Sequence, residues 1–277
     1  MAKEKLNIPI AKTEFDDEDF QAQLKPLKSG WIVQGPHVKE FEDKWNSFSG
    51  ANHSIATTSC TSSLHMSLIA LDIKEEDEVI VPAFTWISSA NVVEHVKAKV
   101  IFCDISLDTF NIDCEKIRDL ITPKTKAIIP VHLFGLPADM DSILKVANEF
   151  NLAVIEDAAC GFNARYKGQH VGTIGDTGCF SFHPRKAITT GEGGMITTNN
   201  EELAVKLRSL RDHGAAITDL QRHYGNKPYL LPDFPYAGYN YRMTDIQASI
   251  GSSQMNRATE IGQKRKDIAS LYDDKLK

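Results

Sequence analysis

Short, continuously apolar segments alternate with amphipathic ones along most of the chain. The apolar segments predict strands at residues 53–57, 78–81, 100–103, 127–131 and 152–155. The segments between them predict helices at residues 64–71, 85–95, 113–121 and 139–150. Strands that are apolar on both faces and separated by helices are typical of a parallel sheet covered on both sides. We therefore predict an α/β fold with a mostly parallel sheet flanked by helices.

The composition is that of a globular protein, and it narrows the possible partners. Of the 277 residues, 42% are hydrophobic and 25% are charged, and the net charge is −6. This charge argues against nucleic acid as a partner, since the longest basic run is Lys264-Arg265-Lys266. No apolar run approaches the length that spans a membrane. The odd, scattered set of cysteines predicts a reducing, cytoplasmic location. Five scattered cysteines and nine histidines without metal-ligand spacing predict neither a disulfide nor a metal site.

Ligands of such sheets bind at the carboxyl ends of the strands, and four of these ends carry candidate residues. Lys186 lies on a short loop between apolar segments 179–182 and 195–197, beside three glycines. It is either a solvated turn residue or an amine nucleophile that forms a Schiff base. Asp157 follows the strand at 152–155 and is either a capping residue or the partner of a protonated ring nitrogen.

The other two strand ends offer hydroxyl groups and an aromatic ring. Residues 58–63, TSCTSS, lead into a helix and form either an ordinary N-cap or a phosphate site. Trp86 either packs in the core or stacks on a flat ligand. Together, the four strand ends provide what pyridoxal phosphate requires: an amine, an acid for the ring nitrogen, a stacking ring and phosphate anchors.

Four strings carry a resemblance to a known family: PAFTWISSAN (82–91), VIEDAA (154–159), SFHPRKAITTGEGG (181–194) and GYNYRMTDIQASIG (238–251). They resemble the DegT/DnrJ-type sugar-nucleotide aminotransferases, which are pyridoxal phosphate enzymes of fold type I. The resemblance extends from about Ser29 to the C-terminus. It implies a large domain at residues 1–255, followed at 256–277 by the start of a small C-terminal domain that is mostly missing.

The resemblance also implies roles for individual residues. Lys186 resembles the Schiff-base lysine and Asp157 the partner of the pyridine nitrogen, so both are the catalytic candidates. The implied cofactor-binding residues are Thr61, Ser62, Trp86, Asp157, Cys160, Ser181, Lys186 and Asn240. Asn240 matches a residue that reaches the phosphate from a neighbouring subunit, which implies a homodimer with a shared active site. Arg242 is the candidate for binding an anionic group of the substrate.

The implied reaction transfers an amino group from L-glutamate to a nucleotide-linked keto-deoxysugar. The GEGG and YNYRMT strings resemble those of enzymes that aminate C4. The family suggests a role in polysaccharide biosynthesis. Two departures qualify it. Cys160 stands where relatives often have Gln or His, and a thiol is a weaker hydrogen-bond partner. The chain also stops within the expected small domain, so we expect it to keep the cofactor site and to be slow or inactive.

Three alternatives remain. A sugar dehydratase of the same fold is one, although such relatives have histidine in place of Lys186. A non-catalytic or inactive truncated homologue that keeps the cofactor pocket is the second. A dinucleotide-dependent oxidoreductase is the third, but no GxGxxG follows the first strand.

Overall fold

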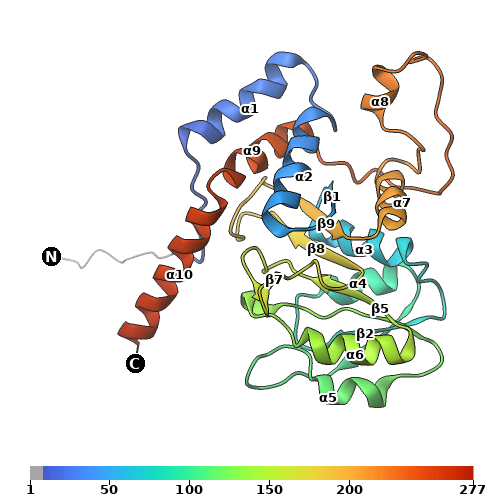
Figure 1. Cartoon of the computed structure of the whole chain (residues 1–277), viewed down its shortest axis with the longest axis vertical. Helices are drawn as coiled ribbons and strands as arrows, with labels where there is room; N and C mark the ends of the chain where they lie inside the picture. The colour runs from blue at the N-terminus through green and yellow to red at the C-terminus, as the bar shows by residue number, and fades with distance from the viewer. Residues whose placement is uncertain (1–8, 277) are drawn as a thin grey trace.

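The computed structural model describes residues 9–276 and contains a central sheet of seven strands (Figure 1). The strands are β1 (His53–Thr57), β2 (Glu78–Pro82), β3 (Lys99–Cys103), β4 (Thr125–Ile128), β5 (Ala153–Asp157), β8 (Thr177–Ser181) and β9 (Gly194–Thr198). Their spatial order is β1-β9-β8-β5-β4-β2-β3. β9 runs antiparallel to β1 and β8, and the other pairs are parallel. The prediction of a mostly parallel sheet is confirmed.

Helices and a small hairpin connect the strands. The helices are α1 (Asp17–Ser29), α2 (Pro36–Ser49), α3 (Cys60–Ala70), α4 (Ser88–His95), α5 (Cys114–Ile117), α6 (Met140–Phe150), α7 (Glu201–Arg211), α8 (Asp219–His223), α9 (Asp245–Met255) and α10 (Ala258–Lys275). Two 3-10 turns, η1 (Arg118–Leu120) and η2 (Leu133–Gly135), and the hairpin β6 (Arg165–Tyr166) and β7 (Gln169–His170) complete the elements. None of the described helices is long and apolar enough to cross a bilayer.

The sheet is the middle of three layers, because helices pack on both of its faces. Neighbouring residues of each strand point to opposite faces and so contact different helices. Val79 and Val81 of β2 belong to a core cluster with α3 and α4 on one face. Ile80, between them, belongs to a cluster with α5 and α6 on the other face. The same alternation separates Ile155 from Val154 in β5. Burial on both faces explains why these strands read as continuous apolar runs.

An aromatic cluster joins α2 to β8 and to the residue that follows β8. Trp45 of α2 is fully buried, and its ring centroid lies 4.9 Å from that of Phe180 and 5.1 Å from that of Phe182. Phe41 lies 5.0 Å from Phe182 by the same measure. Aromatic pairs at these separations stabilise a core beyond the area that they bury. The cluster therefore fixes α2 against the strand that leads to the loop of Lys186.

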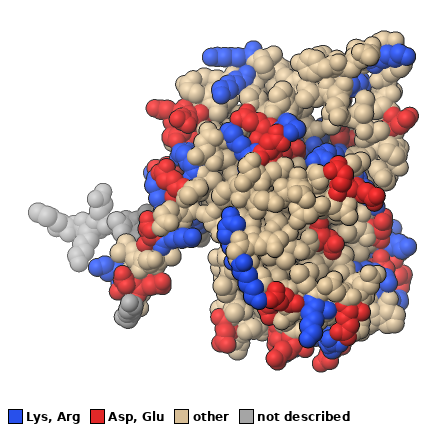
Figure 2. All heavy atoms as spheres, viewed as in Figure 1, with Lys and Arg blue, Asp and Glu red and all other residues tan. Residues whose placement is uncertain are grey.

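The long helix α10 extends away from the body of the molecule (Figure 1). It begins at Ala258, three residues after α9 ends at Met255. The proposed domain boundary between residues 255 and 256 falls in this short connection, and residues 1–8 of the proposed large domain lie outside the described part. Charges of both signs are interspersed on the face shown in Figure 2, around a broad uncharged area.

The topology brings the ends of several strands to one edge of the sheet. The parallel strands β1, β5 and β8 end there, at Thr57, Asp157 and Ser181. Because β9 is antiparallel, its first residue, Gly194, lies at the same edge and pairs with Ser181. The segments that carry the predicted site residues thus start from a common edge of the sheet.

Candidate active site

Lys186 lies in the loop that joins β8 to β9. Its backbone N–H donates to the carbonyl of His183, 2.8 Å away, which closes a turn. The loop returns through Gly191, whose φ of +83° is one that residues with a side chain rarely adopt. The Lys186 side chain is half-buried, and its Nζ donates to Cys160 Sγ at 3.2 Å. The lysine is therefore an inward-facing amine beside a thiol.

Asp157 ends β5 with its side chain almost buried, at 5% exposure. The Ser89 hydroxyl of α4 donates to Asp157 Oδ2 at 2.7 Å, and the Ala159 N–H donates to Oδ1 at 3.1 Å. These contacts fix the carboxylate on the α3 and α4 face of the sheet. Ser89 was not among the predicted site residues, although it lies in the string PAFTWISSAN.

The N-terminus of α3 lies next to the first residue of β9. Ser59 and Ser62 form a reciprocal cap, in which the hydroxyl of each accepts the backbone N–H of the other. A Cβ on Gly194 would lie 2.4 Å from the backbone carbon and oxygen of Ser59, so only glycine fits there without a shift. The first N–H groups of a helix have no partner within it, and they bind anions well. Thr61 and Ser62 thus lie where a phosphate could be held.

The Cys60 thiol, at the start of α3, shows that these groups lie close together. Burial raises its pKa well above the ordinary value; the charge of Asp157 raises it further, and that of Lys186 lowers it. Cys160, Ser181 and Lys186 line one cavity of about 670 Å³. The structure therefore brings together Lys186, Asp157, Cys160, Ser181 and the start of α3.

Of the nine predicted site residues, only Cys160, Ser181 and Lys186 line this cavity, and three of the other six are exposed or paired elsewhere. Trp86 is 75% exposed in the loop before α4, which begins at Ser88, three residues later than expected. Asn240 is also exposed, and its backbone forms an isolated antiparallel β-bridge with that of Asp212. The Arg242 guanidinium donates to Asp212 Oδ1 at 2.6 Å, so within this chain it is already paired with a carboxylate. Within the single chain, none of the three lines the cavity.

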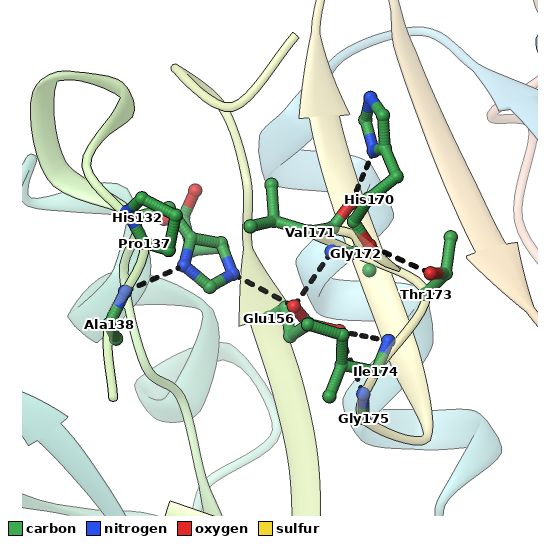
Figure 3. Close-up of polar contacts among 12 residues, drawn as sticks. His132, Pro137, Ala138, Glu156, His170, Val171, Gly172, Thr173, Ile174 and Gly175 are labelled. Carbon is green, nitrogen blue, oxygen red and sulfur yellow. Dashed lines mark hydrogen bonds and ion pairs between the residues drawn. The ribbon is translucent and has the colours of Figure 1, made fainter. Parts of the chain in front are cut away.

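A buried carboxylate next to Asp157 was missed by the sequence analysis. Glu156 is fully buried and points to the opposite face of β5 (Figure 3). Its Oε1 accepts the N–H groups of Ile174 and Gly175 at 2.8 and 2.7 Å, and its Oε2 accepts that of Gly172 at 2.7 Å. The fourth donor is His132 Nε2, 2.8 Å from Oε2. Four donors therefore satisfy both carboxylate oxygens.

The partners of His132 determine its tautomer. Its Nδ1 accepts the N–H of Ala138 at 3.1 Å, so the proton is on Nε2, which donates to Glu156 (Figure 3). Burial raises the pKa of Glu156, but the hydrogen bonds from His132 and the backbone outweigh it and hold the pKa below its ordinary value. The backbone N–H of His132 also donates to the backbone carbonyl of Asp157 at 3.0 Å. The pair thus holds the strand end that carries Asp157.

Comparisons with known proteins agree with this geometry. Residues 13–277 match the model of the DegT/DnrJ/EryC1/StrS aminotransferase family. The chain belongs to this family. An uncharacterised protein of Methanocaldococcus jannaschii is 46% identical over 269 residues, which are 97% of this chain and 69% of that protein. GDP-perosamine synthase of Caulobacter vibrioides is 44% identical over 270 residues, 97% of this chain and 70% of the synthase.

Solved structures show the same fold. A protein of Streptococcus pneumoniae assigned as a sugar aminotransferase superposes with a TM-score of 0.90 at 34% identity in its PMP form, over 97% of this chain and 72% of that one. The same protein has also been solved in a PLP form. The DegT family members are aminotransferases that use pyridoxal phosphate, so the recognised family, fold type I and the cofactor are confirmed.

The residues present fit this cofactor. Lys186 supplies an inward-facing amine, and Asp157 a fixed, nearly buried carboxylate. The N-terminus of α3, against which Gly194 packs, is a candidate site for the phosphate. No group of His, Cys, Asp and Glu that could hold a metal occurs within residues 9–276.

Proposed function

We propose that this chain transfers an amino group from L-glutamate to a nucleotide-linked keto-deoxysugar, at C4. The observation that carries the proposal is Lys186, whose amine lies in a cavity at the same sheet edge as the carboxylate of Asp157. Similarity to GDP-perosamine synthase supports a nucleotide-linked sugar as the substrate. The GEGG and YNYRMT strings favour the C4 position.

Pyridoxal phosphate supplies an aldehyde that condenses with amines and a ring that accepts electrons. We assign Lys186 two tasks: it holds the cofactor through its amine, and when released it moves a proton at the reacting carbon. Asp157 would accept the ring N–H and so keep the ring protonated. Ser89 and Ala159, which donate to Asp157, hold its carboxylate in place.

Further residues would hold the cofactor in place. We assign the phosphate to Thr61, Ser62 and Ser181, with Asn240 contributed by a second subunit of a homodimer. Trp86 would cover the ring, and Cys160 would lie near the ring hydroxyl, where its contact with Lys186 favours a lysine directed inward. We place the reaction in the cytoplasm.

The first test is a visible absorption spectrum of the purified chain with pyridoxal phosphate, before and after L-glutamate. We expect a yellow band that glutamate bleaches, and we expect borohydride to remove the band while fixing the cofactor covalently to Lys186. Lys186→Ala should abolish the band, whereas Lys145→Ala, on α6, should leave it unchanged. A band that persists in Lys186→Ala would contradict the assignment.

The second step separates the alternatives. Amination of a nucleotide keto-sugar in a screen would support a transaminase, and release of water without amination would support the sugar dehydratase. A band that glutamate leaves unchanged would favour a non-catalytic or inactive homologue.

A further inference from the structure

The cavity that contains Lys186 is also bounded by α10. Its volume, about 670 Å³, lies within the range of small-molecule sites. Lys186, Cys160 and Ser181 line it from the sheet side, and Arg265 and Lys266 line it from α10. This volume exceeds what the Lys186 side chain fills, so the cavity has room for a ligand next to the lysine.

The cavity lining is cationic. It includes Arg185, Lys186, Arg265 and Lys266, and none of its lining residues is Asp or Glu, although the whole chain has a net charge of −6. Within residues 9–276, the side chains of Arg185, Arg265 and Lys266 have neither a hydrogen bond nor an ion pair. Their neighbour Lys264, in contrast, binds Glu260 at 2.8 Å and does not line the cavity. Uncompensated like charges around one space favour an anionic ligand.

Close packing keeps α10 beside the cavity. A Cβ on Gly262 would lie 1.5 Å from Asn163 Nδ2, so the glycine lets the helix approach the segment that follows Cys160. Gly262 and Asn163 both line the cavity. The cationic residues of α10, one turn further along, are therefore held near Lys186 by this packing.

We propose that Arg185, Arg265 and Lys266 bind the diphosphate of the nucleotide-linked substrate while its sugar lies toward Lys186. The inference rests on the proposed function and adds the residues that select a diphosphate. Arginine binds phosphate oxygens in bidentate geometry, and lysine adds a point charge. The carboxylates of L-glutamate are the other source of anionic oxygens, and the experiment separates the two.

The test measures binding of inorganic pyrophosphate, and of GDP, UDP and dTDP, by calorimetry to the chain loaded with pyridoxal phosphate. Loading the cofactor first keeps its own phosphate site filled. The variants are Arg185→Ala and the double variant Arg265→Ala/Lys266→Ala, with Lys264→Ala as the matched control on the same helix. Because these side chains are exposed, the variants should fold, which circular dichroism verifies.

We expect each cavity variant to weaken pyrophosphate binding about tenfold or more, because each removes a charge-assisted contact. Lys264→Ala should bind as the unchanged protein does, and glutamate should bleach the visible band at the same half-saturating concentration in all forms. No pyrophosphate binding by the unchanged protein, or equal binding by all variants, would overturn the inference. A shift in the glutamate concentration alone would do so too, by assigning the cations to the amino donor. Failure of the proposed function would instead appear as absence of the visible band.

Discussion

Cys160 differs from the other four cysteines in its exposure and in its neighbour. It is exposed, and its Sγ accepts from Lys186 Nζ. Burial raises the pKa of Cys60 and Cys179 well above the ordinary value, that of Cys103 to about 11 and that of Cys114 to about 12. Since only thiolates react readily with alkylating agents, these four should react slowly at pH 8.

We therefore expect one equivalent of iodoacetamide at pH 8 to label Cys160 first and to reduce loading of pyridoxal phosphate, because the added group fills space next to Lys186. Peptide mass spectrometry and the visible band check the two parts. Cys160→Ser should resist the loss of loading. Earlier labelling of Cys103 or Cys114 would contradict the prediction.

Glu156→Gln tests the buried carboxylate. Either orientation of the amide would direct its NH₂ group toward two N–H donors, so we expect a loss of about 2–5 kcal/mol in the free energy of unfolding at pH 7. Urea denaturation measures it. Glu149→Gln, an exposed residue that pairs with Arg118, is the matched control and should leave the free energy of unfolding almost unchanged.

The same variant gives a pH dependence. The pKa of Glu156 is lowered by folding, so its contribution is complete above its unfolded pKa of about 4.3 and is lost as pH falls through the folded pKa. Glutamine does not titrate, so the stability gap between the two proteins should narrow in acid. A gap that stays constant down to the acid transition would show that Glu156 is not ionised in the fold.

Sequence patterns predicted Lys186 and Asp157 as site residues because each lies at a strand end next to a recognisable string, and the structure places both at one edge of the sheet. They did not identify Glu156, whose function depends on His132 and residues 172–175, which are distant in sequence. One signal was available: residues alternate across a strand, so Glu156 had to face away from Asp157 and be buried. A buried carboxylate needs donors, but the sequence does not say which.

At the level of elements, continuous apolar runs predicted strands close to β1, β2, β3 and β5, because parallel strands are buried on both faces. The predicted run at 127–131 was displaced from β4, which ends at Ile128, although the chain stays beside β5 through an isolated bridge between Val131 and Asp157. The antiparallel direction of β9 could not be predicted, since it depends on the short loop of Lys186 returning the chain beside β8.

That return depends on Gly194, and it provides an element-scale prediction. Gly194→Ala should push α3 away from β9, at a cost of about 1–3 kcal/mol, and weaken cofactor binding because the phosphate site moves. Fluorescence titration with pyridoxal phosphate measures the affinity. Gly50→Ala is the control: its φ of +80° gives a comparable strain of about 1–2 kcal/mol, but nothing lies within 4 Å and the site is not involved. Equal affinities of both variants would argue against the phosphate site.

At the scale of the whole molecule, the carboxyl edge of the sheet leaves large apolar groups in solvent. Trp86 and Phe134 are about three-quarters exposed. The rings of Phe84 and Phe110 lie 5.7 Å apart between centroids, and those of Phe110 and Phe134 lie 6.5 Å apart. Contiguous exposed apolar groups commonly mark an interaction surface. They support the proposed homodimer, in which a second chain would cover this edge.

The shared site of that dimer can be tested by complementation. Asn240→Ala should weaken cofactor loading, and Lys186→Ala should abolish the visible band and the covalent fixation of the cofactor by borohydride. In a mixed dimer of the two variants, one site has both defects, whereas the other combines Lys186 from one subunit with Asn240 from its partner. After unfolding and refolding a 1:1 mixture, random pairing should restore about a quarter of the glutamate-bleachable sites. Sedimentation should show a dimer throughout, and a mixture no better than the average of the two variants would place Asn240 and Lys186 in independent sites.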